Sequence, residues 1–266
     1  MTEIVGDRWT AGDAYESYMG RWSRLVAREF LAWLGADSQR HWLEVGCGTG
    51  ALTSSICTLC EPASLVACDP SAPFVEFARS TVSDARVDCV TADADTLPGR
   101  AHGFDIIVSG LVLNFLSDPA AALAAMRERL RSRGVVAAYV WDYTDGFEFL
   151  RYFWEEAVAF DPGAASMDES QRFGEWRLPH IRSLFEAAGL SQVESTALTV
   201  PTTFATFDDY WRPFLGGTGP APGYVASRTP PQRDALAARL RTRLPAAPDG
   251  SIRLEARAFA VRGVAE

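Results

Sequence analysis

The stretch WLEVGCGTGALT, residues 42–53, places three glycines between a short apolar run and a segment with helical spacing. Gly46, Gly48 and Gly50 stand where a predicted strand turns into a predicted helix. Glycine permits positive φ at such a turn, and its missing Cβ lets a ligand lie against the backbone. The N–H groups at the start of the next helix favour an anionic group. The stretch therefore predicts a ligand-binding turn at the end of a buried strand.

From residue 41 to residue 141 the chain alternates five predicted strands with helical segments. The strands are 41–45, 64–68, 86–90, 104–110 and 135–141; the helices are 52–59, 72–80 and one that begins after Asp118 and ends at Gly134. Helical spacing also marks 9–34 and 180–190, and two more strands are predicted at 193–200 and 252–261. This order predicts an α/β fold: a Rossmann-like, seven-stranded, mostly parallel sheet with helices on both faces.

The composition narrows the possible partners. The net charge is −9 and all 25 basic residues are arginines, so lysine chemistry is excluded and a nucleic-acid partner is disfavoured. No run reaches the roughly 20 apolar residues of a membrane span, and the start shows no export signal, so we expect no membrane contact and a cytoplasmic location. The five cysteines, including Cys57 and Cys60, are expected to be free thiols in the core and not a metal site.

The glycine turn alone leaves two cofactor classes open. Gly46-x-Gly48-x-x-Ala51 is compatible with a dinucleotide fingerprint, and Asp69 follows near the spacing of a ribose-binding acid. A nicotinamide-dependent oxidoreductase therefore remains an alternative.

Four linked motifs favour a cofactor class other than the dinucleotides. LEVGCGTG (43–50), ACDPS (67–71), DADTLP (93–98) and FDIIVSGLVLNFLSDP (104–119) each follow or contain a separate predicted strand. With them the sequence resembles the class I S-adenosylmethionine (SAM) methyltransferases. YESYMGRWSR (15–24) and LEARAFAVRG (254–263) resemble the small-molecule branch of that family, whose last strand is antiparallel. The resemblance implies a single domain over 1–266, with a SAM-binding core at 41–141 and helical lid or substrate-covering segments at 1–35, 142–178 and 202–250.

The resemblance also implies the cofactor-binding residues. Asp69 would accept the ribose hydroxyls, Asp93 and the Ala94 N–H would face adenine, and the glycine turn with Arg21 would hold the methionine carboxylate. Carbonyls at Ser109 and Gly110, with Glu44 or a water that it holds, would receive the ammonium. The full set is Tyr15, Met19, Arg21, Glu44, Gly46, Gly48, Gly50, Asp69, Pro70, Asp93, Ala94, Ser109 and Asn114.

The implied reaction is in-line displacement of the sulfonium methyl group, which yields S-adenosylhomocysteine and depends mainly on alignment in a dry site. No catalytic residue is identified; Asp142, Tyr143 and Asn114 are candidates, with Asp208 and Asp209 as further acids. No metal is expected. The motifs of DNA-methylating enzymes are absent and the two insertions are rich in aromatic residues, so we expect a small-molecule acceptor. A SAM-binding protein of the same fold without methylating activity is the second alternative.

Overall fold

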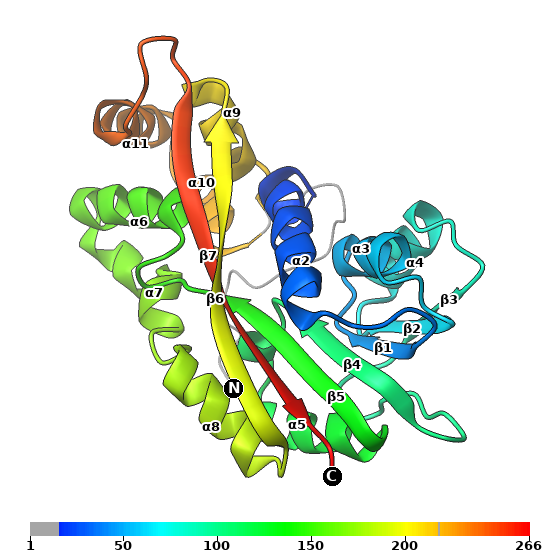
Figure 1. Ribbon diagram of the computed structural model, residues 1–266. Helices are drawn as coiled ribbons and strands as arrows, with labels where there is room; N and C mark the ends of the chain where they lie inside the picture. Colours follow the sequence, from blue (N-terminus) through cyan, green and yellow to red (C-terminus); the bar gives the residue numbers. More distant parts are fainter. Residues whose placement is uncertain (1–15, 218) are drawn as a thin grey trace. The chain divides into compact units, whose positions relative to one another are not determined.

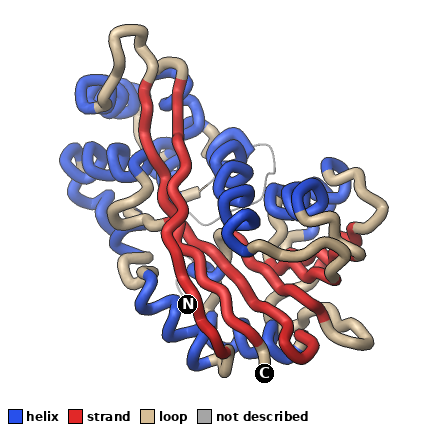
Figure 2. Tube along the Cα trace, in the orientation of Figure 1, coloured by secondary structure: helices blue, strands red, loops and turns tan. Residues whose placement is uncertain are grey.

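The computed structural model describes residues 16–217 and 219–266, so Tyr15 lies outside the described residues. Its seven-stranded sheet has the order β3-β2-β1-β4-β5-β7-β6 (Figures 1 and 2). The strands are β1 (His41–Val45), β2 (Ser64–Asp69), β3 (Val87–Thr91), β4 (Phe104–Gly110), β5 (Leu130–Trp141), β6 (Ser191–Phe204) and β7 (Ile252–Val264). The helices are η1 (Glu16–Gly20), α2 (Arg21–Leu34), α3 (Ala51–Leu59), α4 (Ala72–Thr81), η2 (Leu113–Phe115), α5 (Pro119–Glu128), α6 (Glu148–Phe160), η3 (Pro162–Met167), α7 (Glu169–Arg172), α8 (Leu178–Ala187), α9 (Phe207–Trp211), η4 (Arg212–Leu215), α10 (Pro220–Ala226) and α11 (Pro230–Arg243).

The strand directions agree with the predicted sheet. β1 pairs in parallel with β2 and β4, and β2–β3 and β4–β5 are parallel as well. β7 runs antiparallel to β5. The backbone N–H of Arg133 donates to the Ala265 carbonyl at one end (2.9 Å), and the backbone N–H of Asp142 donates to the Arg257 carbonyl at the other (2.9 Å). The α/β fold with an antiparallel last strand is confirmed.

The chain divides into two compact units. The core unit comprises 23–140, 175–198 and 258–266, and it contains β1 to β4 with the helices α3, α4, α5 and α8. The insertion unit comprises 1–22, 141–174 and 199–257, and its described part contains η1, α6, α7 and α9 to α11. Both segments that interrupt the predicted alternation are thus largely helical. None of the helices in the described ranges is both long and apolar enough to cross a membrane.

Two details of the predicted core are wrong. Helix α5 begins behind Asp118 as expected, since the Asp118 carboxylate accepts the Ala121 N–H (2.9 Å), but it ends at Glu128 and not at Gly134. Strand pairing begins immediately afterwards, because Phe104 donates to the Arg129 carbonyl and pairs with Leu130. Gly134 therefore lies inside β5. The connection at 92–103 contains turns and no helix, which breaks the strict alternation.

The central strands are buried as their sequences predict. β4 is buried from Phe104 to Ser109, and β1 is buried from Trp42 to Val45. Such a nearly continuous apolar run suits a parallel strand that is covered on both faces. The five cysteines are free and buried, as predicted. This burial leaves the loops at the carboxyl ends of β1, β2 and β4 as the places where polar groups can meet a ligand.

Candidate cofactor site

The turn after β1 has two glycines with different surroundings. Gly46 has φ +81°, and a Cβ there would come within 2.4 Å of a Val112 methyl carbon. Gly48 has φ +50°, and no heavy atom among the described residues lies within 4 Å of the place where its Cβ would stand. Packing therefore requires glycine at 46, whereas at 48 the bare backbone borders open space that a ligand can occupy.

The same turn is held to β2 through its backbone. The Gly46 and Cys47 N–H groups both donate to the Cys68 carbonyl, at 2.8 and 2.9 Å. Gly50 is the N-cap of α3 and gives its first turn no side-chain hydrogen bond. A helix start without a side-chain cap, beside a glycine turn, suits an anionic group.

Asp69 closes this site from the end of β2. Its Oδ2 accepts the Gly48 N–H at 3.0 Å and its Oδ1 accepts the Ser71 N–H at 2.9 Å. The side chain is buried, and this burial raises its pKa although the two N–H bonds act in the opposite direction. Each carboxylate oxygen still has a lone pair to offer, so Asp69 can accept two hydroxyl groups of a ribose. Pro70, which follows it, is exposed.

Glu44 lies inside β1 and is 1% exposed. Its Oε2 accepts the Thr53 hydroxyl of α3 at 2.6 Å, and burial raises its pKa to about 8. The group is thus mainly neutral near pH 7. It ties β1 to the helix that starts at the glycine turn; its partner Thr53 was missed by the sequence motifs, since nothing in them marks a buried threonine.

The end of β4 contributes a second set of polar groups. Ser109 is fully buried, and its hydroxyl donates to the Val45 carbonyl at 2.9 Å. A Cβ on Gly110 would come within 2.6 Å of the Tyr139 hydroxyl oxygen, so this strand end cannot carry a larger residue without rearrangement. The Asn114 side chain is 7% exposed, and within 16–217 and 219–266 neither amide atom has a hydrogen-bond partner. Such a buried amide is free to hydrogen-bond a ligand or an ordered water.

Asp93 lies in the turn after β3 and is exposed. Its carboxylate accepts the N–H groups of Asp95 (3.1 Å) and Thr96 (2.8 Å) and the Thr96 hydroxyl (2.6 Å). These bonds lower its pKa, the Thr96 hydroxyl most. Asp93 therefore shapes its own turn, and the contacts of Asp93 and Ala94 with adenine stay a prediction.

The predicted site residues that lie in the insertion unit make their contacts with other residues of that unit. Arg21 Nη1 contacts Asp209 Oδ1 at 3.3 Å, and its guanidinium carbon lies 4.1 Å from the Trp22 ring centre and 4.7 Å from that of Phe204. Met19 is buried. Asp208 is paired with Arg241 at 3.6 Å. The roles predicted for Arg21 and Met19 at the cofactor therefore stay predictions.

Asp142, a candidate catalytic residue, has several hydrogen-bond partners, and its catalytic role stays a prediction. It is 1% exposed, its Oδ2 accepts Arg257 Nε at 2.8 Å, and its Oδ1 accepts the N–H groups of Thr144 and Asp145, both at 3.2 Å. Asp142 joins the end of β5 to β7. Tyr143 is buried against Phe173, with ring centres 5.1 Å apart.

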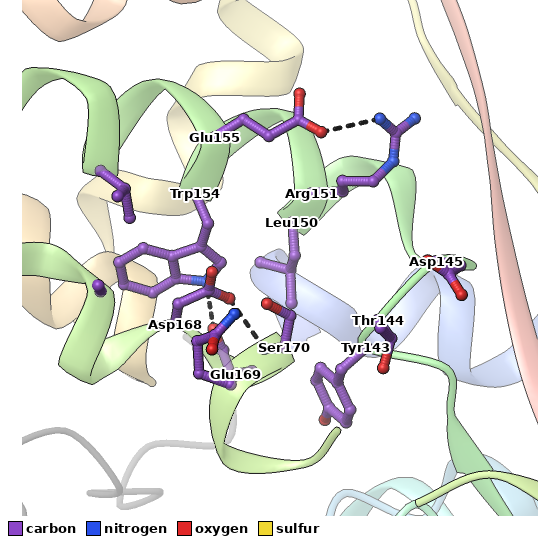
Figure 3. A pocket seen from close by; sticks show the side chains of 13 residues that line it. Tyr143, Thr144, Asp145, Leu150, Arg151, Trp154, Glu155, Asp168, Glu169 and Ser170 are labelled. Carbon is purple, nitrogen blue, oxygen red and sulfur yellow. Dashed lines mark hydrogen bonds and ion pairs between the residues drawn. The ribbon is translucent and has the colours of Figure 1, made fainter. Parts of the chain in front are cut away.

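A pocket of about 440 Å³ lies in the segment that begins with Tyr143 (Figure 3). Its lining includes Trp154, whose indole N–H donates to the buried Glu169 carboxyl. Glu169 was missed by the sequence analysis, because an acid in the first turn of a short helix is typical of an exposed position.

Comparison with known proteins agrees with this geometry. A family model described as a methyltransferase domain matches residues 43–138. Malonyl-[acyl-carrier protein] O-methyltransferases of Acetivibrio thermocellus and Hahella chejuensis are 25% identical over 145 residues and 32% identical over 130 residues. These matches cover 54% and 49% of this chain and 50% and 47% of the relatives, so the chain spans about half the length of these relatives.

Solved structures share the fold. A putative methyltransferase of Bacillus halodurans has a TM-score of 0.57 at 13% identity, covering 90% of this chain and 97% of its own. A phosphoethanolamine N-methyltransferase 2 of Haemonchus contortus, in complex with S-adenosyl-L-methionine, has a TM-score of 0.58 at 16% identity, covering 98% and 59%.

The matched domain contains the glycine turn, Asp69, Asp93 and the end of β4. In this family S-adenosyl-L-methionine is the cofactor, and the open side of Gly48, the buried Asp69 and the partnerless Asn114 amide fit such a ligand. By its sheet order and by this match, residues 43–138 form a methyltransferase domain with the fold of the class I SAM-dependent methyltransferases.

Proposed function

We propose that this chain transfers the methyl group of SAM to a small-molecule acceptor and releases S-adenosylhomocysteine. The observation that carries the proposal is the Asp69 carboxylate, which bridges the Gly48 and Ser71 N–H groups beside open backbone. A bare turn against a buried acid is suited to a nucleoside with two free hydroxyl groups.

The residues have separate tasks in this proposal. Asp69 accepts the ribose hydroxyls, and the uncapped start of α3 attracts the amino-acid carboxylate. Carbonyls at the end of β4 and the Asn114 amide oxygen accept from the ammonium group. When bound, the sulfonium supplies an electrophilic methyl carbon that an acceptor lone pair attacks as the carbon–sulfur bond breaks. Alignment of the two reactants supplies most of the activation.

No dedicated base is assigned. Asp142 is paired with Arg257 and Asp209 with Arg21, so this proposal gives neither carboxylate a proton-transfer role. The proton of a neutral acceptor passes to solvent in this proposal. The net charge of −9 favours a small acceptor over a nucleic acid. The similar proteins have acceptors as different as malonyl-[acyl-carrier protein] and phosphoethanolamine in their names, so they support the reaction type and not one substrate.

The first test is Asp69→Ala. Loss of both hydroxyl contacts is expected to weaken SAM binding at least about tenfold in titration calorimetry, since hydrogen bonds to a charged group contribute about 1.5–3 kcal/mol each. Asp88→Ala is the matched control, because Asp88 is an exposed acid on the neighbouring strand β3. Unchanged affinity in a folded Asp69→Ala protein would refute the ribose assignment.

The two alternatives need a second experiment. Calorimetry with NADH in place of SAM tests the oxidoreductase alternative, because an oxidoreductase would bind NADH in preference to SAM. Release of S-adenosylhomocysteine in the presence of an acceptor panel separates a methyltransferase from a protein that binds SAM without transferring its methyl group. SAM binding with no release for any acceptor, amines and carboxylic acids included, would favour the latter.

A further inference from the structure

The pocket in the insertion unit is formed by one continuous part of the chain, from Tyr143 to Gln171 (Figure 3). Its volume of about 440 Å³ falls in the range of small-molecule sites, roughly 300–1,000 Å³. Leu150, Trp154 and Val158 of α6 form an apolar wall. Pockets with an apolar wall and a few polar groups are suited to compact organic ligands.

The charged lining of this pocket is predominantly acidic. Among the residues that the structure describes, it contains four carboxyl groups and one guanidinium: Asp145, Glu155, Asp168, Glu169 and Arg151. Arg151 is already paired twice, with Glu155 at 3.0 Å and with Glu148 at 3.0 Å. An anionic ligand would therefore meet a negative surface whose single cation is engaged, whereas a cationic ligand would be attracted.

Glu169 is the buried acid of this lining. It is 3% exposed, and Trp154 Nε1 donates to its Oε2. Figure 3 shows the indole of Trp154 and the carboxyl group of Glu169 turned toward each other. Burial raises the pKa of Glu169 to about 8. A carboxyl group held in this way becomes a full anion when a positive charge is placed beside it.

A second buried polar group lies near Glu169. The Tyr18 hydroxyl of η1 has no hydrogen-bond partner among the residues that the structure describes, and the side chain is 1% exposed. Burial raises the Tyr18 pKa most, and Glu169 and Tyr143 raise it further, which places the hydroxyl within their electrostatic range. Tyr18 does not line the pocket, so its hydroxyl contributes to the electrostatic surroundings of Glu169 and not to the binding surface.

We propose that this pocket binds an organic cation, with a substituted ammonium group against Glu169 and an apolar body along Leu150 and Trp154. The indole face adds attraction for the cation. Binding of this cation does not depend on the proposed function. The pocket lies outside residues 43–138, so the relatives' domain does not determine its ligand.

The affinity for a permanent cation is expected to depend on pH. Several charged and titratable groups lie near Glu169 or in the same lining. They are Tyr18 of η1, Tyr143 and Asp145 after β5, Arg151 and Glu155 of α6, Asp168 at the N-cap of α7, and Arg172 of α7. Binding of a cation favours the ionised form of Glu169, whose pKa in the folded protein without a ligand is about 8. Affinity should therefore rise between pH 6 and pH 8, by up to about tenfold per unit, and then level off.

The test compares phenyltrimethylammonium with tert-butylbenzene, which has the same shape and no charge. Both are titrated into the full chain without SAM, and binding is followed by tryptophan fluorescence. We expect the cation to bind at least about tenfold more tightly at pH 7.5, a difference of about 1.4 kcal/mol. Equal affinities, or no binding of the cation, would overturn the proposal.

Two further measurements locate the charge effect. Glu169→Gln keeps the shape of the side chain and should remove most of the preference for the cation. Glu156→Gln is the control, since Glu156 of α6 pairs with Arg239 at 2.9 Å and does not line the pocket. If Glu169→Gln fails to fold, the wild-type pH series decides, because a flat affinity from pH 6 to pH 8 contradicts the role of Glu169.

Failure of this proposal is distinguishable from failure of the proposed function. SAM binding is measured on the same protein by calorimetry without any cation. Binding of the cation without binding of SAM would refute the methyltransferase proposal alone. Binding of SAM without preference for the cation would refute the pocket proposal alone.

Discussion

Two buried carboxyl groups, Glu44 and Glu169, are expected to make the stability of the protein fall as pH rises. Burial raises the pKa of each to about 8, above the ordinary 4.5 of an unfolded glutamate. Between these values the folded state binds more protons than the unfolded state. The free energy of unfolding should therefore decrease by about 1.4 kcal/mol per pH unit for each group between pH 5 and pH 8.

Urea denaturation at pH 5.5, 6.5 and 7.5 measures this slope. Glu44→Gln should remove the contribution of one group to the slope of stability against pH, and the double variant Glu44→Gln with Glu169→Gln should remove both contributions. Glu61→Gln is the control, since Glu61 is an exposed acid in the loop after α3. A wild-type stability that increases over this range, or a slope that Glu44→Gln leaves unchanged, contradicts the assignment of Glu44.

Single residues were predictable where a local motif requires them. Asp69 and the glycines stand in one motif each, and the structure places Gly48 and Asp69 in contact. The pairing of Asp142 with Arg257 joins positions far apart in the sequence, and no local pattern indicates it. Glu169 is likewise distinguished only by its burial, which depends on the packing of α6 and α7 and not on the residues next to it in the sequence.

The turn from β1 to α3 is expected to tolerate alanine differently at its two ends. Gly46→Ala would combine positive φ with a 2.4 Å approach to Val112, so we expect a loss of stability above about 2 kcal/mol. Gly48→Ala carries the backbone strain alone, about 1–2 kcal/mol. Its new methyl group would fill the open space beside Asp69.

These variants are compared by urea denaturation and by SAM calorimetry. Gly48→Ala should lose SAM affinity at least about tenfold while it stays the more stable of the two. The result that would contradict this assignment is a Gly48→Ala protein with wild-type affinity, because the open space would then not border the cofactor.

The elements themselves followed from periodicity and from turn residues. β1 and β4 have the predicted bounds, and α3 begins one residue earlier than expected. The end of α5 was missed because its last turn is followed by an arginine, and strand pairing at Leu130 outweighs the glycine signal at 134. Tertiary hydrogen bonds, which local sequence does not encode, decided that boundary.

For the whole molecule, the five buried thiols provide a probe of unfolding. Their exposed fractions range from 0% at Cys68 to 8% at Cys57. Burial raises the pKa of each, which further lowers the share of reactive thiolate. With a thiol reagent such as DTNB, we expect none of the five to react at the rate of an exposed cysteine under native conditions, and all five to react in urea.

The reaction is followed by absorbance, with the urea-denatured chain as reference. Rapid labelling of any thiol in the native protein would contradict the burial seen here. SAM should slow any residual labelling, because a ligand that binds only the folded state reduces the unfolded population.

At this scale the sequence predicted the fold class and the cofactor family, since four motifs are spread over the central strands. It also predicted that the segments 142–178 and 202–250 differ from the core. The resemblance also implied that these segments are helical, as the structure shows. Which of their side chains line a pocket could not be predicted, because that depends on how the helices pack.

The continuity of the pocket from Tyr143 to Gln171 has an evolutionary consequence. A binding surface encoded by one uninterrupted stretch can be exchanged or mutated as a block, while the segment at 43–138 that handles the nucleoside stays under its own constraints. Descendants of such a chain can acquire new ligands without rebuilding their donor chemistry. Sequence divergence between relatives should then concentrate in that stretch.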